Sequence, residues 1–289
     1  METKRHIPVW AMAALLLLSS CVKDELYNTP HPRHAKITVT ADWAQRGEGV
    51  GIPGSWTVGM GGYTGIETAA THVPDRLFAP GSYTLAAYSP ADGITVSGTT
   101  ATVDAVGGFI SNVPGWLFTH VQAVTVEADT DTDYEFTATM RQQTRELTLL
   151  IEPEGDAAGR IEAIEGRLSG VAGTLDFATG THGAPSDIEL HFTKITDGDD
   201  AGKWTATVRL LGIAGGTQRL AATLTYTGGN PADTSLDSDL TAALAGFNDD
   251  NAAPLTLGGT MVETPTEAGV TAGITGWETV DGGNVDVEM

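Results

Sequence analysis

The chain has 289 residues, with 37 Asp and Glu against 15 Lys and Arg, so its formal net charge at pH 7 is −22. Such an acidic chain repels a phosphate backbone, and the sequence has no basic stripe interleaved with aromatic residues, which excludes nucleic acid as a partner. With 36 Gly, 13 Pro and a single Cys, the composition predicts many short strands joined by tight turns and excludes an intrachain disulfide.

Residues 1–20 are predicted to be a secretory signal peptide. Lys4 and Arg5 precede an apolar stretch over 7–18, and Ser19 and Ser20 then provide small residues before a cleavage point. The apolar stretch is shorter than the roughly 20 residues that a membrane-spanning helix needs. We therefore predict cleavage between Ser20 and Cys21.

Cys21 is the predicted membrane attachment. The residues 18–21, Leu-Ser-Ser-Cys, resemble the bacterial lipobox, and this resemblance implies that Cys21 is acylated and becomes the first residue of the mature chain. Several acyl chains would make the attachment effectively permanent, because each buried methylene contributes about 0.8 kcal/mol. The alternative is a cysteine that only happens to end the signal peptide.

Directly after the cysteine, Lys23, Asp24 and Glu25 resemble the surface-export signal of Bacteroidales lipoproteins. The resemblance implies a location on the outer face of the outer membrane. A charged, solvated tether is the alternative interpretation. The prolines at 30 and 32 disfavour helix and central-strand pairing, so residues 21–35 are predicted to be an extended tether.

The fold class predicted from the remaining sequence is all-β, with two tandem β-sandwich domains over 36–144 and 145–289. Apolar residues alternate at period two over many short segments. In the first domain these are 36–43, 56–60, 81–88, 99–103, 121–127 and 134–140. In the second they are 145–152, 161–168, 172–177, 188–195, 204–211, 218–226, 255–262 and 273–280.

One short helix is expected in the second domain between residues 234 and 247. Leu236, Leu240 and Leu244 recur at every fourth residue, and Gly246 stands near the end. The possible N-caps are Thr234, Ser235 and Asp237.

The sequence carries no signature of an enzyme or of a bound cofactor. It has neither a Gly-x-Ser-x-Gly elbow nor a His-Glu-x-x-His zinc motif, and its single Cys is assigned to the lipid. Asp129, Asp131 and Asp133 alternate as in a calcium loop, but Tyr134 stands where that loop needs Gly and Met140 where it needs Glu. An EF-hand is therefore excluded, and a weak calcium site stays open.

The run over 21–43, CVKDELYNTPHPRHAKITVTADW, resembles the start of mature FimB-type fimbrial subunits in the Bacteroidales fimbrillin superfamily. Further similar segments are 77–85, 140–147 and 161–177. The resemblance implies two transthyretin-like β-sandwiches and a role as the lipidated anchor or an accessory subunit of a surface fimbria. It implies fimbrial stalk subunits as partners and contact with the outer membrane through the Cys21 lipid.

Subunits of this superfamily assemble by strand exchange, in which backbone hydrogen bonds give affinity and alternate side chains give specificity. A possible donor is the C-terminal segment 270–289, which carries apolar residues at Ile274, Trp277, Val280, Val285 and Val287. The alternative is that residues 273–280 pair within their own domain.

A second functional hypothesis is a surface glycan-binding lipoprotein of a polysaccharide-uptake system. It shares the lipid, the export signal and the β-sandwiches, and it would need solvent-exposed coplanar tryptophans. Trp43, Trp56, Trp116, Trp204 and Trp277 each lie in or beside an apolar strand, which favours core packing.

Overall fold

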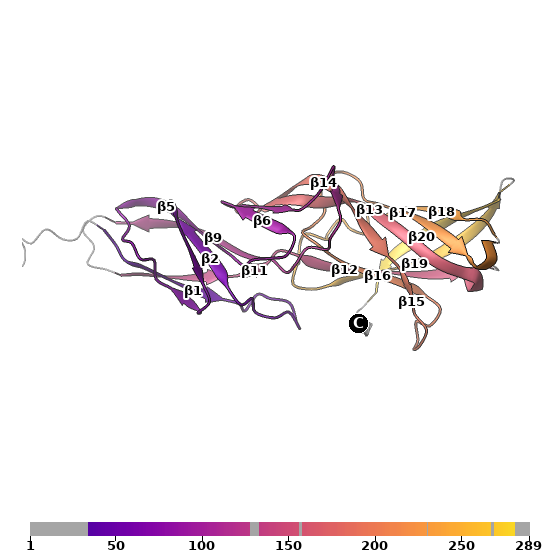
Figure 1. The fold of residues 1–289 in the computed structure, drawn as a ribbon, viewed down its shortest axis with the longest axis horizontal. Helices are drawn as coiled ribbons and strands as arrows, with labels where there is room; N and C mark the ends of the chain where they lie inside the picture. The colour runs from indigo at the N-terminus through magenta and orange to yellow at the C-terminus, as the bar shows by residue number, and fades with distance from the viewer. Residues whose placement is uncertain (1–33, 128–132, 156–157, 230, 267–268, 281–289) are drawn as a thin grey trace, which may run out of the picture.

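The computed structural model describes residues 34–127, 133–155, 158–229, 231–266 and 269–280. These residues form an elongated, almost entirely β molecule, with the N-terminal strands at one end and the C-terminal strands at the other (Figure 1). None of the helices in the described part has the length and apolar character needed to cross a membrane.

The strands up to the middle of the chain are β1 (Ile37–Asp42), β2 (Trp56–Met60), β3 (Tyr63–Glu67), β4 (Thr71–His72), β5 (Gly81–Tyr88), β6 (Ile94–Ser97), β7 (Thr100–Val103), β8 (Phe109–Ile110), β9 (Phe118–Val126), β10 (Tyr134–Thr139) and β11 (Arg141–Gln142). The later elements are β12 (Arg145–Glu154), β13 (Ile161–Asp176), β14 (Thr181–His191), β15 (Thr193–Lys194), β16 (Trp204–Leu210), β17 (Arg219–Tyr226), β18 (Thr234–Asp239), β19 (Leu255–Thr266) and β20 (Gly269–Thr279), with the short 3-10 turns η2 (Ala158–Arg160) and η3 (Thr227–Gly229).

Two sheets form what we call the first unit: a three-stranded sheet in the order β10-β1-β4 and a five-stranded sheet in the order β11-β9-β5-β2-β3. Successive side chains of a strand point to opposite faces, so one alternating set from each sheet fills the space between them. Buried members of this core include Val39 from β1, Val58 from β2, Leu85 from β5 and Phe118 from β9, with Phe78 from a loop.

The second unit is a twelve-stranded sheet whose main path runs β15-β16-β12-β19-β20-β18-β17-β13-β14-β8. Strands far apart in this order, such as β12 with Leu149 and β13 with Ile164, contribute to one hydrophobic core. The sheet therefore curls over itself to enclose that core, as a β-sandwich does.

The two units are interleaved in sequence. Strands β6, β7 and β8, which fall inside the predicted first sandwich, pair instead with the second unit: β7 runs antiparallel to β13, and β8 runs parallel to β14. Ala101, Val103 and Ile110 accordingly belong to the second core. The chain thus passes between the units three times, after β5, after β8 and after β11.

The prediction of a helix between residues 234 and 247 is wrong. Residues 234–239 form strand β18, with Leu236 on its buried face, and Leu240 and Leu244 are buried in the turns that follow. A spacing of four residues is close to one helical turn, but it is also a multiple of the two-residue strand period, so it suits either structure.

The expected strands 161–168 and 172–177 are one strand, β13, interrupted by a bulge between Leu168 and Val171. Gly170 occupies the bulge with φ of 73°, and a Cβ at this position would collide with the carbonyl oxygen of Thr217. Only glycine combines that backbone conformation with so close an approach.

Candidate functional site

Most of the residues singled out from sequence lie at the two ends of the chain. Ser20, Cys21, Lys23, Asp24 and Glu25 precede the described residues, Val285 and Val287 follow them, and Asp129 and Asp131 fall in the gap at 128–132. Their predicted roles stay predictions. Ile274, Trp277 and Val280 are within the described residues.

The N-terminal segment is built into the first unit from Ala35 onward. Ala35 and Phe78 exchange two backbone hydrogen bonds of 2.8 and 2.9 Å. Strand β1 follows and is the central strand of its sheet, parallel to β10 and antiparallel to β4. The predicted tether 21–35 thus leads directly into a buried strand.

The C-terminal strand β20 is a paired strand of its own unit. Nine residue pairs join it to β19, whereas a single bridge, Leu236 to Ala272, joins it to β18. Trp277 supplements that bridge, because its Nε1–H donates to Ser238 Oγ at 2.9 Å. Residues 273–280 therefore pair within their own unit. The rest of the predicted donor, residues 281–289, lies outside the described residues.

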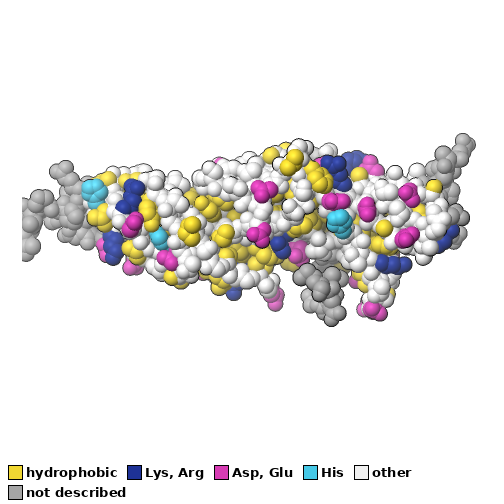
Figure 2. Space-filling view, viewed as in Figure 1, with side chains coloured by type: hydrophobic (Ala, Val, Ile, Leu, Met, Phe, Trp, Pro, Cys, Tyr) yellow, Lys and Arg dark blue, Asp and Glu magenta, His cyan; other side chains and the backbone are white. Residues whose placement is uncertain are grey.

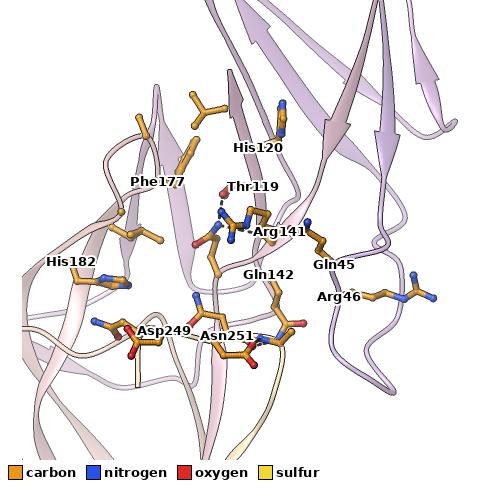
Figure 3. A pocket seen from close by; sticks show the side chains of 18 of the residues that line it. Gln45, Arg46, Thr119, His120, Arg141, Gln142, Phe177, His182, Asp249 and Asn251 are labelled. Atoms are coloured by element: carbon orange, nitrogen blue, oxygen red, sulfur yellow. Dashed lines mark hydrogen bonds between the residues drawn. The ribbon is translucent and has the colours of Figure 1, made fainter. Parts of the chain in front are cut away.

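A polar cleft of about 720 Å³ lies where the two units meet (Figure 3). The loop after β1 contributes Gln45 and Arg46, and β9 and β11 contribute His120, Arg141 and Gln142. The other wall comes from the turn between β13 and β14, from the start of β14 and from the loop at 248–252. It includes Phe177, His182, Asn248, Asp249 and Asn251.

Several polar side chains of this cleft bond the chain to itself. Gln142 is 6% exposed; its Oε1 accepts from the Gly47 N–H at 2.8 Å, and its Nε2 donates to the Asn251 carbonyl at 2.6 Å. Asn248 accepts from the Ile213 N–H at 2.9 Å and donates back to the Ile213 carbonyl at 3.0 Å. These amides hold loops of both units in place. Their hydrogen-bonding groups are therefore already used within the chain and are less accessible to a ligand.

The two imidazoles of the cleft also face backbone carbonyls. His182 Nε2 lies 3.2 Å from the Leu211 carbonyl, and His120 Nδ1 lies 3.2 Å from the Thr139 carbonyl. Burial lowers the pKa of His182, so this ring is neutral at pH 7. In a neutral imidazole, the nitrogen that donates to a carbonyl leaves the other ring nitrogen as an acceptor. His120 Nε2 is buried and has no hydrogen-bond partner among the described residues.

Two arginines, the buried Arg145 and the half-buried Arg209, reinforce the junction. Arg145, at the start of β12, donates from Nε to the Ala253 carbonyl and from Nη1 to the Phe247 carbonyl, each at 2.7 Å. Arg209 donates to the Pro114 carbonyl at 3.0 Å, and its guanidinium lies 3.9 Å from the centre of the Trp116 ring. All three hydrogen bonds join segments far apart in sequence, so the arginines hold the passages between the units in place.

Neither arginine was predicted as a functional residue. Arg145 lies two residues before Leu147 and four before Leu149, so in a strand its side chain points to the same face as theirs. This spacing is the signal in the sequence that Arg145 faces the core. An arginine on an inward face needs buried acceptors, and here backbone carbonyls provide them.

No tryptophan of the described residues forms an exposed platform. Trp56 and Trp204 are 2% and 4% exposed, and Trp43, Trp116 and Trp277 are half-buried. Within the described ranges, no three His, Cys, Asp or Glu side chains gather closely enough to hold a metal ion. On the face shown in Figure 2, acidic side chains are scattered among the white polar ones, and no basic stripe crosses the units.

The comparisons with known proteins identify the fold. No family model matches the chain, and no curated protein matches it. Among solved structures, the fimbrial anchor protein Mfa2 from Porphyromonas gingivalis is similar with a TM-score of 0.59 and 13% identity, over 85% of this chain and 97% of that one.

Two further structures have the same fold. A protein named "a putative adhesin" from Bacteroides ovatus matches with a TM-score of 0.55 and 12% identity, over 73% of this chain and 84% of the other. One of the "putative polysaccharide binding proteins" from Bacteroides thetaiotaomicron matches with a TM-score of 0.51 and 11% identity, over 86% and 98%. The protein therefore has the fold of Bacteroidales adhesins and of a fimbrial anchor.

Proposed function

We propose that this protein is a lipidated cell-surface subunit of a fimbria, acting as its anchor or as an accessory subunit. Cys21 carries the lipid, residues 23–25 direct the protein to the outer face of the outer membrane, and stalk subunits are the partners. The fold shared with Mfa2 over nearly the whole of both chains supports the proposal.

One observation carries the proposal furthest: the chain that follows Cys21 enters the middle of a sheet. Strand β1 has neighbours on both sides and buries Ile37 and Val39. A lipid joined through residues 21–35 to such a strand is connected to the core of the first unit, as an attachment point requires. The internally bonded cleft at the junction is consistent with a structural role.

The experiment is isolation of the protein from intact, mildly cross-linked cells, followed by identification of the proteins that co-purify. An anchor or accessory subunit is expected to bring down a ladder of fimbrial subunits. Recovery of a porin-like outer-membrane transporter without fimbrial subunits would refute the fimbrial role.

For assembly, we propose that the tail 281–289 contributes a donor strand through Val285 and Val287. In an added strand, alternate side chains fill pockets and the intervening ones face away. Replacing both valines with aspartate is therefore expected to abolish incorporation of this subunit into fimbriae. The matched control, Asp286→Asn with Glu288→Gln, changes the intervening positions and should assemble normally. Normal assembly of the valine variant, or of a chain lacking 281–289, would eliminate the tail as donor.

Glycan binding at the cell surface is the second candidate. The name of the similar Bacteroides thetaiotaomicron protein favours it, whereas the packing of the five tryptophans counts against it. Retardation of the purified protein in gels that contain soluble polysaccharides tests this function. Unaltered mobility across plant and host glycans would dismiss it.

A further inference from the structure

Strands β1 and β10 lie side by side in a parallel ladder of six residue pairs, from Ile37 opposite Tyr134 to Asp42 opposite Thr139. The chain from Cys21 enters β1 at its N-terminal end. The chain leaves β10 at its C-terminal end and continues through β11 into β12 of the second unit. Because the strands are parallel, these two points lie at opposite ends of the ladder.

Backbone hydrogen bonds frame this ladder at both ends. The Tyr134 N–H donates to the Lys36 carbonyl at 2.9 Å, and the Met140 N–H donates to the Asp42 carbonyl at 2.8 Å. The regular alternation of a parallel pair then directs the N–H groups of Thr38 and Thr40 toward β10. On the opposite side, the Ala41 N–H donates to the Ala70 carbonyl at 2.8 Å.

The ladder is shielded from water on one face and supported at its other edge. Ile37 and Val39 are 1% and 0% exposed, so water does not reach the ladder from the core side. Beyond β1, Val39 is opposite His72 of β4. His72 is 2.8 Å from the Tyr63 hydroxyl and 3.4 Å from the Glu67 carboxylate, which connects β4 to β3.

We propose that β1 and β10 form a shear clamp, which carries tension between the membrane tether and the rest of the molecule. When the N-terminus of β1 and the C-terminus of β10 are pulled apart, the force acts along the strands and tends to slide one past the other. All six pairs must then yield together, whereas tension at one end would open them one after another. That this tension arises in the cell rests on the proposed function. The resistance of the ladder to shear depends only on how β1 and β10 are paired.

Single-molecule pulling on the mature chain, residues 21–289 without lipid, tests the clamp. Cys21 is the only cysteine and serves as one handle. A second cysteine at Arg141→Cys loads the ladder in shear, and one at Asp133→Cys loads it from a single end; both positions are exposed. The shear geometry is expected to need severalfold more force, because the hydrogen bonds of the whole ladder are loaded together.

Two variants in the shear geometry isolate the backbone contribution. Thr40→Pro removes an N–H directed toward β10, which interrupts the ladder in its middle, and is expected to lower the rupture force measurably below that of the parent chain. Thr40→Val removes the same hydroxyl but keeps the N–H, and its rupture force should equal that of the parent chain. Circular dichroism confirms folding of each variant before pulling.

Equal rupture forces in the two pulling geometries would overturn the clamp, and this comparison holds even where Thr40→Pro fails to fold. The measurement uses neither lipid nor fimbriae. A failure of the clamp is therefore distinguishable from a failure of the anchor proposal, which cell fractionation reports.

Discussion

Replacing Arg145 with alanine is expected to lower the free energy of unfolding by about 3 kcal/mol. The side chain is 8% exposed, and its guanidinium serves the carbonyls of Ala253 and Phe247 and lies 5.1 Å from the centre of the Phe247 ring. Truncation leaves the buried Phe247 carbonyl and the more accessible Ala253 carbonyl without this donor, and it opens a cavity.

Burial lowers the pKa of Arg145, while the carboxylates of Asp250 and Asp249 act in the opposite direction. The guanidinium nevertheless stays charged at neutral pH, because an arginine side chain is effectively always protonated in proteins. The expected stability loss is therefore independent of pH between about 6 and 8.

Urea-induced unfolding followed by tryptophan fluorescence measures this loss. The matched control is Arg219→Ala, which removes an exposed ion pair with Asp237 and should cost less than about 1 kcal/mol. Arg145→Lys keeps the charge but loses the planar fork, and it should fall between the two. A loss for Arg145→Ala no greater than that of Arg219→Ala would show that the buried arginine does not hold the junction.

Replacing Cys21 with alanine is expected to move the protein from the membrane fraction to the culture medium. Without a thiol there is no acylation, and each acyl chain lost removes about 0.8 kcal/mol of membrane affinity per buried methylene. Immunoblots of fractionated cultures measure the distribution. Val22→Ala preserves the cysteine and should stay in the membrane. A Cys21→Ala protein that remained in the membrane pellet would refute the lipid attachment.

The export signal is separable from the lipid by the same assay. Changing Lys23, Asp24 and Glu25 together to alanine should leave the protein in the membrane fraction but remove it from the cell surface. Protease treatment of intact cells reports this difference. If the variant protein were as accessible to protease as the parent protein, residues 23–25 would not be an export signal but only part of a solvated tether.

Much of the strand content could be predicted from alternation alone. The expected segments 56–60 and 81–88 coincide with β2 and β5. In β2 buried residues alternate with more accessible ones, whereas in β5 the three consecutive residues 85–87 are all buried. The same reasoning predicts β12 and β16. It also predicts that Arg145 faces the core, because Arg145 lies two residues from Leu147 in the same strand.

The pairing of β6, β7 and β8 with the second unit could not be predicted in this way. Alternation identifies a strand but does not name its neighbour, and Thr102 pairs with Thr174, far along the chain. The junction depends on such distant contacts as well. Gln142 and Arg145 follow each other closely, yet their acceptors lie in the loop before β19. Nothing in the local sequence identifies those carbonyls as the partners of Gln142 and Arg145.

The central claim is that this protein holds a fimbria on the cell, and the location of fimbriae in a strain carrying Cys21→Ala tests it most directly. Electron microscopy of the cells, together with immunoblots of fimbrial subunits in the cleared medium, gives the measurement. The anchor account predicts bare cells and intact fimbriae in the medium, with this protein attached to them. Fimbriae that stay on the cells while the unlipidated protein is released would contradict it.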